Sequence, residues 1–93
     1  MTYWIGYWRT GQGEIARVGS FDSIVKARKR AITVLRTSEY HWAAIYDGKD
    51  KIYHKENIEF GPGRQFISTK YDPKSRHYIS HLINTDGTLG GIY

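Results

Sequence analysis

The chain has 93 residues and no cysteine, so it can bury one modest hydrophobic core and has neither a disulfide framework nor a thiolate metal site. Its formal net charge of +5 favours acidic partners, and its 40% hydrophobic residues argue against disorder. It contains no apolar run of about 18 residues, and no basic segment followed by an apolar stretch at its start. We therefore expect no membrane span, no secretory signal and a cytoplasmic location.

The apolar composition favours β-sheet. Eleven isoleucines stand against three leucines and three valines, and fourteen residues are aromatic. Isoleucine, tyrosine, tryptophan and phenylalanine all suit a pleated, half-buried surface.

The first predicted element is a β-hairpin, with strands over residues 3–10 and 14–18 around the turn Gly11-Gln12-Gly13. In the first strand, Tyr3, Ile5 and Tyr7 share one face, whereas Trp4 and Trp8 share the other. We expect one of these faces to lie in the core and the other to be exposed or at an interface.

One amphipathic helix is predicted from about residue 23 to about residue 37, with Asp22 as its N-cap. Its apolar face is broad, which indicates that it packs flat across a sheet. Arg28 lies within that apolar face. We expect its stem to pack on the sheet and its guanidinium to reach water or a carboxylate such as Glu56 or Glu59.

The remaining elements are all predicted strands. A second hairpin spans residues 41–55 with its tip at 47–50, which would place Ile45 opposite Ile52 and Ala43 opposite His54. After the break at 61–63, strands follow over residues 64–71, 76–84 and 89–93.

These elements predict an α+β fold in the order β-β-α-β-β-β-β. An antiparallel sheet of about five to seven strands would pack on one central amphipathic helix. We expect residues 1–93 to form a single domain, with Gly61-Pro62-Gly63 as a joint inside it rather than a boundary.

The leading functional hypothesis is a small, non-enzymatic binding or regulatory protein that occupies the surface of a macromolecular partner. Residues 24–38 carry five basic and no acidic side chains, so the basic excess is concentrated on the helix. The partner would be nucleic acid or an acidic protein that handles nucleic acid, and compact inhibitors of phages and plasmids are similar in style. The candidate binding residues comprise four cations and three aromatic anchors: Lys26, Lys29, Arg30, Arg36, Trp4, Trp8 and Trp42.

The main alternative is a toxin-like ribonuclease that needs no metal, only a base, an acid and cations around the scissile phosphate. Its residues would come from the C-terminal strands: His77, His81, Arg64, Arg76 and Tyr78. No carboxylate lies at zinc-like spacing from the histidines, so we expect neither a metal site nor a cofactor. A third hypothesis is an interaction protein in which exposed aromatic side chains close a homodimer.

The chain resembles two known families in part. Residues 18–21, followed by a helix with Ala27 and Leu35, resemble the opening of a SPOR domain, which binds peptidoglycan glycan strands. That family has a second helix where this chain has residues 61–63 and further strands. The size and basic character are similar to RelE-like messenger-RNA-cleaving toxins, but those open with two helices. No family is assigned from the sequence.

Overall fold

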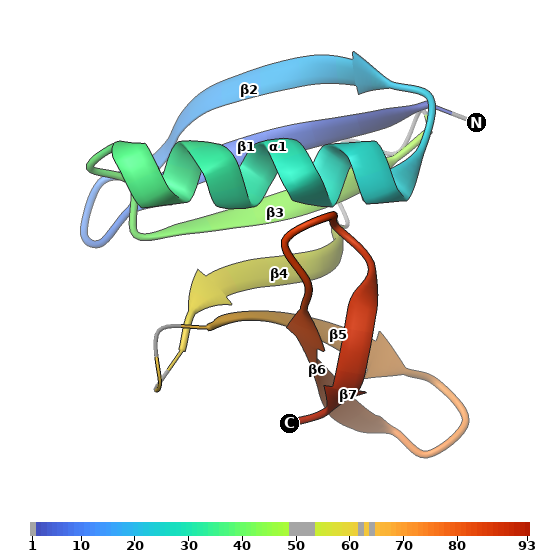
Figure 1. Cartoon of the computed structure of the whole chain (residues 1–93). Coiled ribbons are helices and arrows are strands. Elements are labelled where there is room, and N and C mark those ends of the chain that lie inside the picture. Colours follow the sequence, from blue (N-terminus) through green and yellow to red (C-terminus); the bar gives the residue numbers. More distant parts are fainter. Residues whose placement is uncertain (1, 49–53, 62, 64) are drawn as a thin grey trace.

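The computed structural model, which describes residues 2–48, 54–61, 63 and 65–93, contains one helix and one seven-stranded sheet (Figure 1). The predicted α+β class, with its antiparallel sheet and its element order, is confirmed. The sheet order is β2-β1-β3-β4-β5-β6-β7, and all neighbouring strands are antiparallel. The elements are β1 (Tyr3–Arg9), β2 (Gly13–Phe21), α1 (Ile24–Thr37), β3 (Trp42–Asp47), β4 (His54–Phe60), β5 (Phe66–Asp72), β6 (His77–Ile83) and β7 (Leu89–Ile92).

The sheet curls around one side of α1. In Figure 1, β4 to β7 bend beneath the helix, and the turn between β6 and β7 comes back to it. Gly87 of that turn has φ +91°, and a Cβ there would lie 2.3 Å from the carbonyl oxygen of Val25 in α1. Only glycine fits this contact without strain, because it lacks the Cβ and tolerates positive φ.

The hydrophobic core lies between α1 and the sheet. Ala27 and Ala31 are fully buried on the helix, and such small side chains allow its backbone to approach the strands closely. On β1, Ile5 and Tyr7 belong to this core, whereas Trp4 and Trp8 lie on the other face. The two-residue alternation predicted for β1 therefore holds, and the helix covers the Ile5 and Tyr7 face.

The helix begins one residue later than predicted, and its cap is different. Ser23 is the N-cap, with an extended backbone and a hydroxyl that accepts from the amides of Val25 (3.1 Å) and Lys26 (3.4 Å). The prediction of Asp22 as N-cap is wrong. The strand β2 continues to Phe21, which pairs with Tyr3, so Asp22 still belongs to the connection and Ser23 is the residue at which the helix starts. The Asp22 carboxylate instead pairs with the Lys26 ammonium at 3.1 Å.

The predicted register of the second hairpin is also wrong. Ile45 lies opposite Glu56, and Ala43 lies opposite Ile58, each four positions further along β4 than expected. Because four is an even number, Glu56 and Ile58 lie on the face that the predicted alternation gives them, but an irregularity between Ile45 and Tyr46 places His54 opposite Tyr46 rather than Ala43. This register buries Ile58 in the core and brings Glu56 beneath α1.

The predicted joint at 61–63 falls in the connection between β4 and β5, where residues 62 and 64 lie outside the described residues. The two strands that flank it pair with each other over Asn57–Phe60 and Phe66–Thr69, within the same sheet. The assignment of residues 1–93 to a single domain stays a prediction.

Candidate binding surfaces

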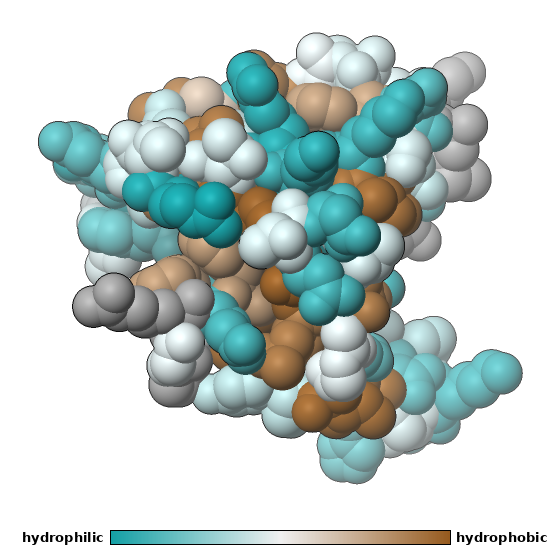
Figure 2. All heavy atoms as spheres, in the orientation of Figure 1, coloured by the Kyte–Doolittle hydropathy of each residue, from teal (hydrophilic) through white to brown (hydrophobic). Residues whose placement is uncertain are grey.

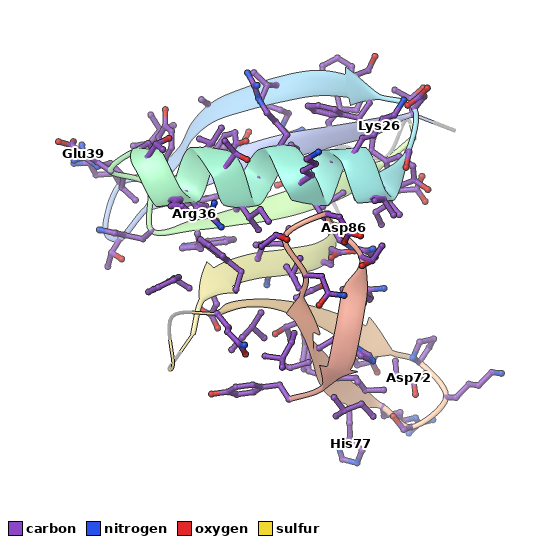
Figure 3. All side chains as sticks on the ribbon, in the orientation of Figure 1. Lys26, Arg36, Glu39, Asp72, His77 and Asp86 are labelled. Atoms are coloured by element: carbon purple, nitrogen blue, oxygen red, sulfur yellow. The ribbon has the colours of Figure 1, made fainter. Side chains whose placement is uncertain are left out.

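The solvent side of α1 carries four exposed cations: Lys26, Lys29, Arg30 and Arg36. Figure 2 shows hydrophilic side chains spread over the helix, and Figure 3 places Lys26 and Arg36 toward its opposite ends. Lys26 pairs with Asp22, but within the described part of the chain the other three form no ion pair. Apart from Lys26, this side of the helix therefore presents positive charge that no ion pair of the described residues neutralises, although the Asp86 carboxylate interacts with Lys29 at longer range.

The four cations form two groups on the helix. Arg30 and Val34 lie toward β2, beside Val18 and Phe21, and Lys26 stands four residues before Arg30 in the same row of the helix. Arg36 lies toward the curled strands, with its guanidinium 5.8 Å from the centre of the Phe66 ring. Lys29 lies against the turn that contains Gly87.

A groove of about 410 Å³ separates α1 from β2. It exists because the helix packs mainly over β1, β3 and β4 and leaves β2, the outermost strand, largely uncovered. Its lining is mostly apolar, with one cation among it: Tyr7, Ala16, Val18, Gly19, Phe21, Arg30, Val34 and Tyr40.

Tyr7 contributes an unusual polar atom to this groove. Its ring stacks on Tyr40, with the centroids 5.1 Å apart, and its hydroxyl is buried without a hydrogen-bond partner among the described residues. Burial raises the pKa of Tyr7 to about 12, although the charge of Arg30 acts in the opposite direction. Buried hydroxyls are nearly always hydrogen bonded, so this atom stands out in the core.

The three predicted aromatic anchors lie on the far face of the sheet. Trp8 stacks on Trp42, with the centroids 4.3 Å apart and the planes at 8°, and the Trp4 ring covers Gly19. Beside them, Tyr46 is covered by the guanidinium of Arg17, 4.0 Å above its ring. The sheet therefore separates the tryptophans from the helix cations, and the two sets do not form one surface.

The residues of the predicted ribonuclease site are also divided. His77 and His81 share a face of β6, opposite Asp72 and Ser68, whereas Tyr78 lies on the other face and packs edge-on against Tyr71. At about 3.3 Å per residue, the two histidines are about 13 Å apart along the strand. A single phosphate cannot touch both.

The two arginines of the predicted ribonuclease site do not complete it among the described residues. Arg76 lies in the turn before β6 with φ 60°, and its amide donates to the carbonyl oxygen of Asp72 at 2.8 Å. Arg64 lies outside the described residues. Figure 3 places His77 at the end of the molecule away from Lys26 and Arg36, so the ribonuclease set and the helix cations are separate surfaces.

Arg28 forms a buried ion pair beneath α1. Its Nε and Nη2 donate to the two carboxylate oxygens of Glu56, each at 3.0 Å, and its Nη1 lies 3.4 Å from the carbonyl oxygen of Gly87. The Ser68 hydroxyl also donates to Glu56, and the Lys70 ammonium lies 3.9 Å away. The predicted carboxylate partner is confirmed as Glu56, and the pair joins the helix, β4 and the β6–β7 turn.

The α1–β2 groove was not predicted from the sequence. The available signal was weak: Arg30 and Val34 lie one helical turn apart, and Tyr7 places a hydroxyl on a core-facing strand position. Neither feature shows how far across the sheet the helix sits, and that distance decides whether a groove remains beside β2.

No three histidine, aspartate or glutamate side chains of residues 2–48, 54–61, 63 and 65–93 are grouped so that they could hold a metal ion. The helix in this part of the chain is too short and too polar to cross a membrane. No protein-family model, no curated protein and no solved structure matches the chain.

Proposed function

We propose that this is a small, non-enzymatic binding protein that uses the solvent side of α1 to engage an acidic segment of a partner protein. One observation carries the proposal: Lys29, Arg30 and Arg36 are exposed on one helix and form no ion pair with the described residues. Unpaired cations held in fixed positions attract negative charge and speed its approach.

A protein partner is favoured over single-stranded nucleic acid because the rings near Arg30, Tyr7 and Tyr40, stack on each other, and the tryptophans lie on the other face of the sheet. Single-strand binders place aromatic side chains beside their cations, so that bases stack while the backbone is neutralised. Here Trp8 and Trp42 stack on each other, on the face of the sheet opposite the cations. Binding to a phosphate backbone without stacking is the alternative outcome of the test below.

Charge alone gives weak binding on an open surface. An exposed ion pair contributes about 0.2–1 kcal/mol and is screened by salt, so three or four of them would support only a transient complex. A specific complex therefore needs apolar contacts close to the cations, and the groove beside Arg30 offers them.

The proposal is tested by fluorescence anisotropy with labelled polyglutamate, single-stranded RNA, single-stranded DNA and duplex DNA, at low and near-physiological salt. The variant Lys29→Glu/Arg30→Glu should weaken the binding of polyglutamate at least tenfold at low salt. The matched control Lys74→Glu/Arg76→Glu makes the same change of charge in the β5–β6 turn and should have little effect.

Equal effects of the two variants would contradict the proposal, because net charge rather than the helix would then control binding. If nucleic acid binds and polyglutamate does not, the partner is a nucleic acid and the proposal of a protein partner is wrong. Cleavage of the recovered RNA, abolished by His77→Ala or His81→Ala and unaffected by a chelator, would favour the ribonuclease alternative.

A homodimer remains a second candidate because of the exposed aromatic side chains at the C-terminal strands. Tyr71, Tyr78 and Tyr93 are 52%, 71% and 57% exposed, unlike the tryptophans, which are all partly covered. Sedimentation velocity at two concentrations decides this question. A concentration-dependent rise in sedimentation that Tyr78→Ala abolishes would support the dimer.

A further inference from the structure

The strand β2 is an open edge of the sheet beside the basic helix. Seven of its nine residues pair with β1, with irregularities at Ile15 and Ser20, and none pairs with another described strand. In Figure 1, α1 runs back alongside β2. The groove is lined by Ala16, Val18 and Phe21 along β2 and by Arg30 and Val34 of α1, so it follows the strand. An edge strand offers unpaired amides and carbonyls, to which an extended peptide can add as a further strand.

The groove fits the side chains of such a peptide. In an added strand, every second side chain points to the same face of the sheet, here the face toward α1. A volume of about 410 Å³ holds one or two apolar side chains, and Val18, Phe21 and Val34 supply an apolar lining.

Two polar groups define what else the peptide must carry. The Tyr7 hydroxyl is a buried donor without a partner among the described residues, and Arg30 carries an unpaired charge in the same groove. Leaving a buried hydroxyl unsatisfied is unfavourable, and an oxygen acceptor from a bound peptide would recover part of that cost. A carboxylate satisfies both groups, since it accepts a hydrogen bond and bears negative charge.

We propose that an extended acidic segment of the partner adds to the free edge of β2, places an apolar side chain in the groove and directs a carboxylate to Arg30 and the Tyr7 hydroxyl. This inference rests on the proposed function and specifies where on the α1 side the partner binds.

The test uses fluorescein-labelled decapeptides in which glutamate and valine, isoleucine, leucine or phenylalanine follow each other at every second position, with threonine between them, so that carboxylates and apolar side chains share one face. Each has two N-methylated versions, one for each set of alternate amides. A strand pairs through only one set. We therefore expect one N-methylated version to bind at least tenfold more weakly, and the other to bind like the parent peptide.

Two variants of β2 distinguish binding in the groove from nonspecific electrostatic attraction. Val18 lines the groove and is 45% exposed, whereas Ile15 is 44% exposed on the same strand and does not line it. Val18→Lys and Ile15→Lys add the same positive charge. Attraction between charges would strengthen peptide binding in both, but occupation of the groove requires that Val18→Lys weaken it about tenfold. Tyr7→Phe should weaken it severalfold without unfolding the protein.

The outcomes distinguish this inference from the proposed function. In a first outcome, the peptides bind, and Lys29→Glu/Arg36→Glu weakens their binding while Val18→Lys and N-methylation do not. The groove is then not the binding site, but the proposed function of the basic helix side is still supported. If no acidic peptide and no polyglutamate bind, both proposals are overturned. Selective loss in Val18→Lys, in Tyr7→Phe and in one N-methylated version supports both.

Discussion

The two faces of the sheet differ in how they are covered and in what they leave available. One face lies under α1, which buries an apolar layer and the Arg28–Glu56 pair while it holds other cations in solvent. No helix of the described residues lies on the opposite face, where aromatic rings cover β1 and β3, with Trp8 stacked on Trp42. Aromatic content and positive charge are both high in the composition, but the three tryptophans are partly covered, whereas Lys29, Arg30 and Arg36 are exposed and form no ion pair with the described residues. The helix side is therefore the better candidate for binding.

The largest effect is expected at the buried ion pair of the helix side. Arg28→Met leaves the Glu56 carboxylate buried without its main partner, which should lower the free energy of unfolding by about 3 kcal/mol. This is near the lower end of the usual range, because the Lys70 ammonium stays 3.9 Å away. Urea denaturation measures it. The double variant Arg28→Met/Glu56→Leu should regain most of the loss, and failure to do so would mean that packing, not the buried charge, is responsible.

The contrast between the two faces of the sheet requires that the tryptophans are packed and do not form a free surface. Trp8 is partly covered, and a Cβ on Gly6 would lie 2.7 Å from its ring, so we expect Trp8→Ala to lower the free energy of unfolding by about 2–3 kcal/mol. Tyr78→Ala, on a side chain that is 71% exposed, should lower it by less than about 1 kcal/mol. Equal small losses would show that the tryptophans are available to a partner instead.

Alkaline pH tests the burial of the Tyr7 hydroxyl. Its pKa is raised to about 12 by burial, above the ordinary value of 10.0, so the folded protein holds this proton more tightly than the unfolded chain. Its contribution is complete below pH 10 and is lost as the pH rises toward 12, which amounts to about 2 kcal/mol. Urea denaturation between pH 9 and 12 should show a steeper decline for the native protein than for Tyr7→Phe. Identical slopes would mean that the hydroxyl is not buried.

The smallest expected effect concerns the start of α1. Ser23→Ala removes the hydroxyl that caps two amides and should lower the free energy of unfolding by about 1 kcal/mol. Asp22→Ala removes only an exposed ion pair and should change it by a few tenths of a kcal/mol. Thermal denaturation measures the stability of both variants. A larger loss of stability in Asp22→Ala than in Ser23→Ala would mean that Asp22 is the N-cap.

Much of the fold follows from local patterns in the sequence. The two-residue period of β1 separates Ile5 from Trp4, and the 3.6-residue period of α1 separates its core side from its cations. Arg28 stands out as a charge on an apolar helix face, which is why a carboxylate partner could be anticipated. Of the two glutamates proposed, Glu56 shares a face with the buried Ile58, whereas Glu59 does not.

The rest depends on tertiary geometry. The period of β1 does not reveal which of its faces receives α1, and so the separation of the tryptophans from the cations could not be predicted. The register of β4 depends on the length of a turn and on the pairing of Glu56 with Arg28. The groove depends on how far α1 lies from β2, and the curl of the sheet depends on the contact of Gly87 with α1.

The most direct test of whether the helix side binds an acidic segment is to map the backbone amide chemical shifts during titration with the tightest-binding acidic decapeptide. We expect the changes to concentrate on α1 and β2, around Arg30 and Val18, and to diminish in Lys29→Glu/Arg30→Glu. Changes centred on Trp8 and Trp42, or on the β5–β6 turn, would contradict this expectation, as would shifts that persist unchanged in that variant.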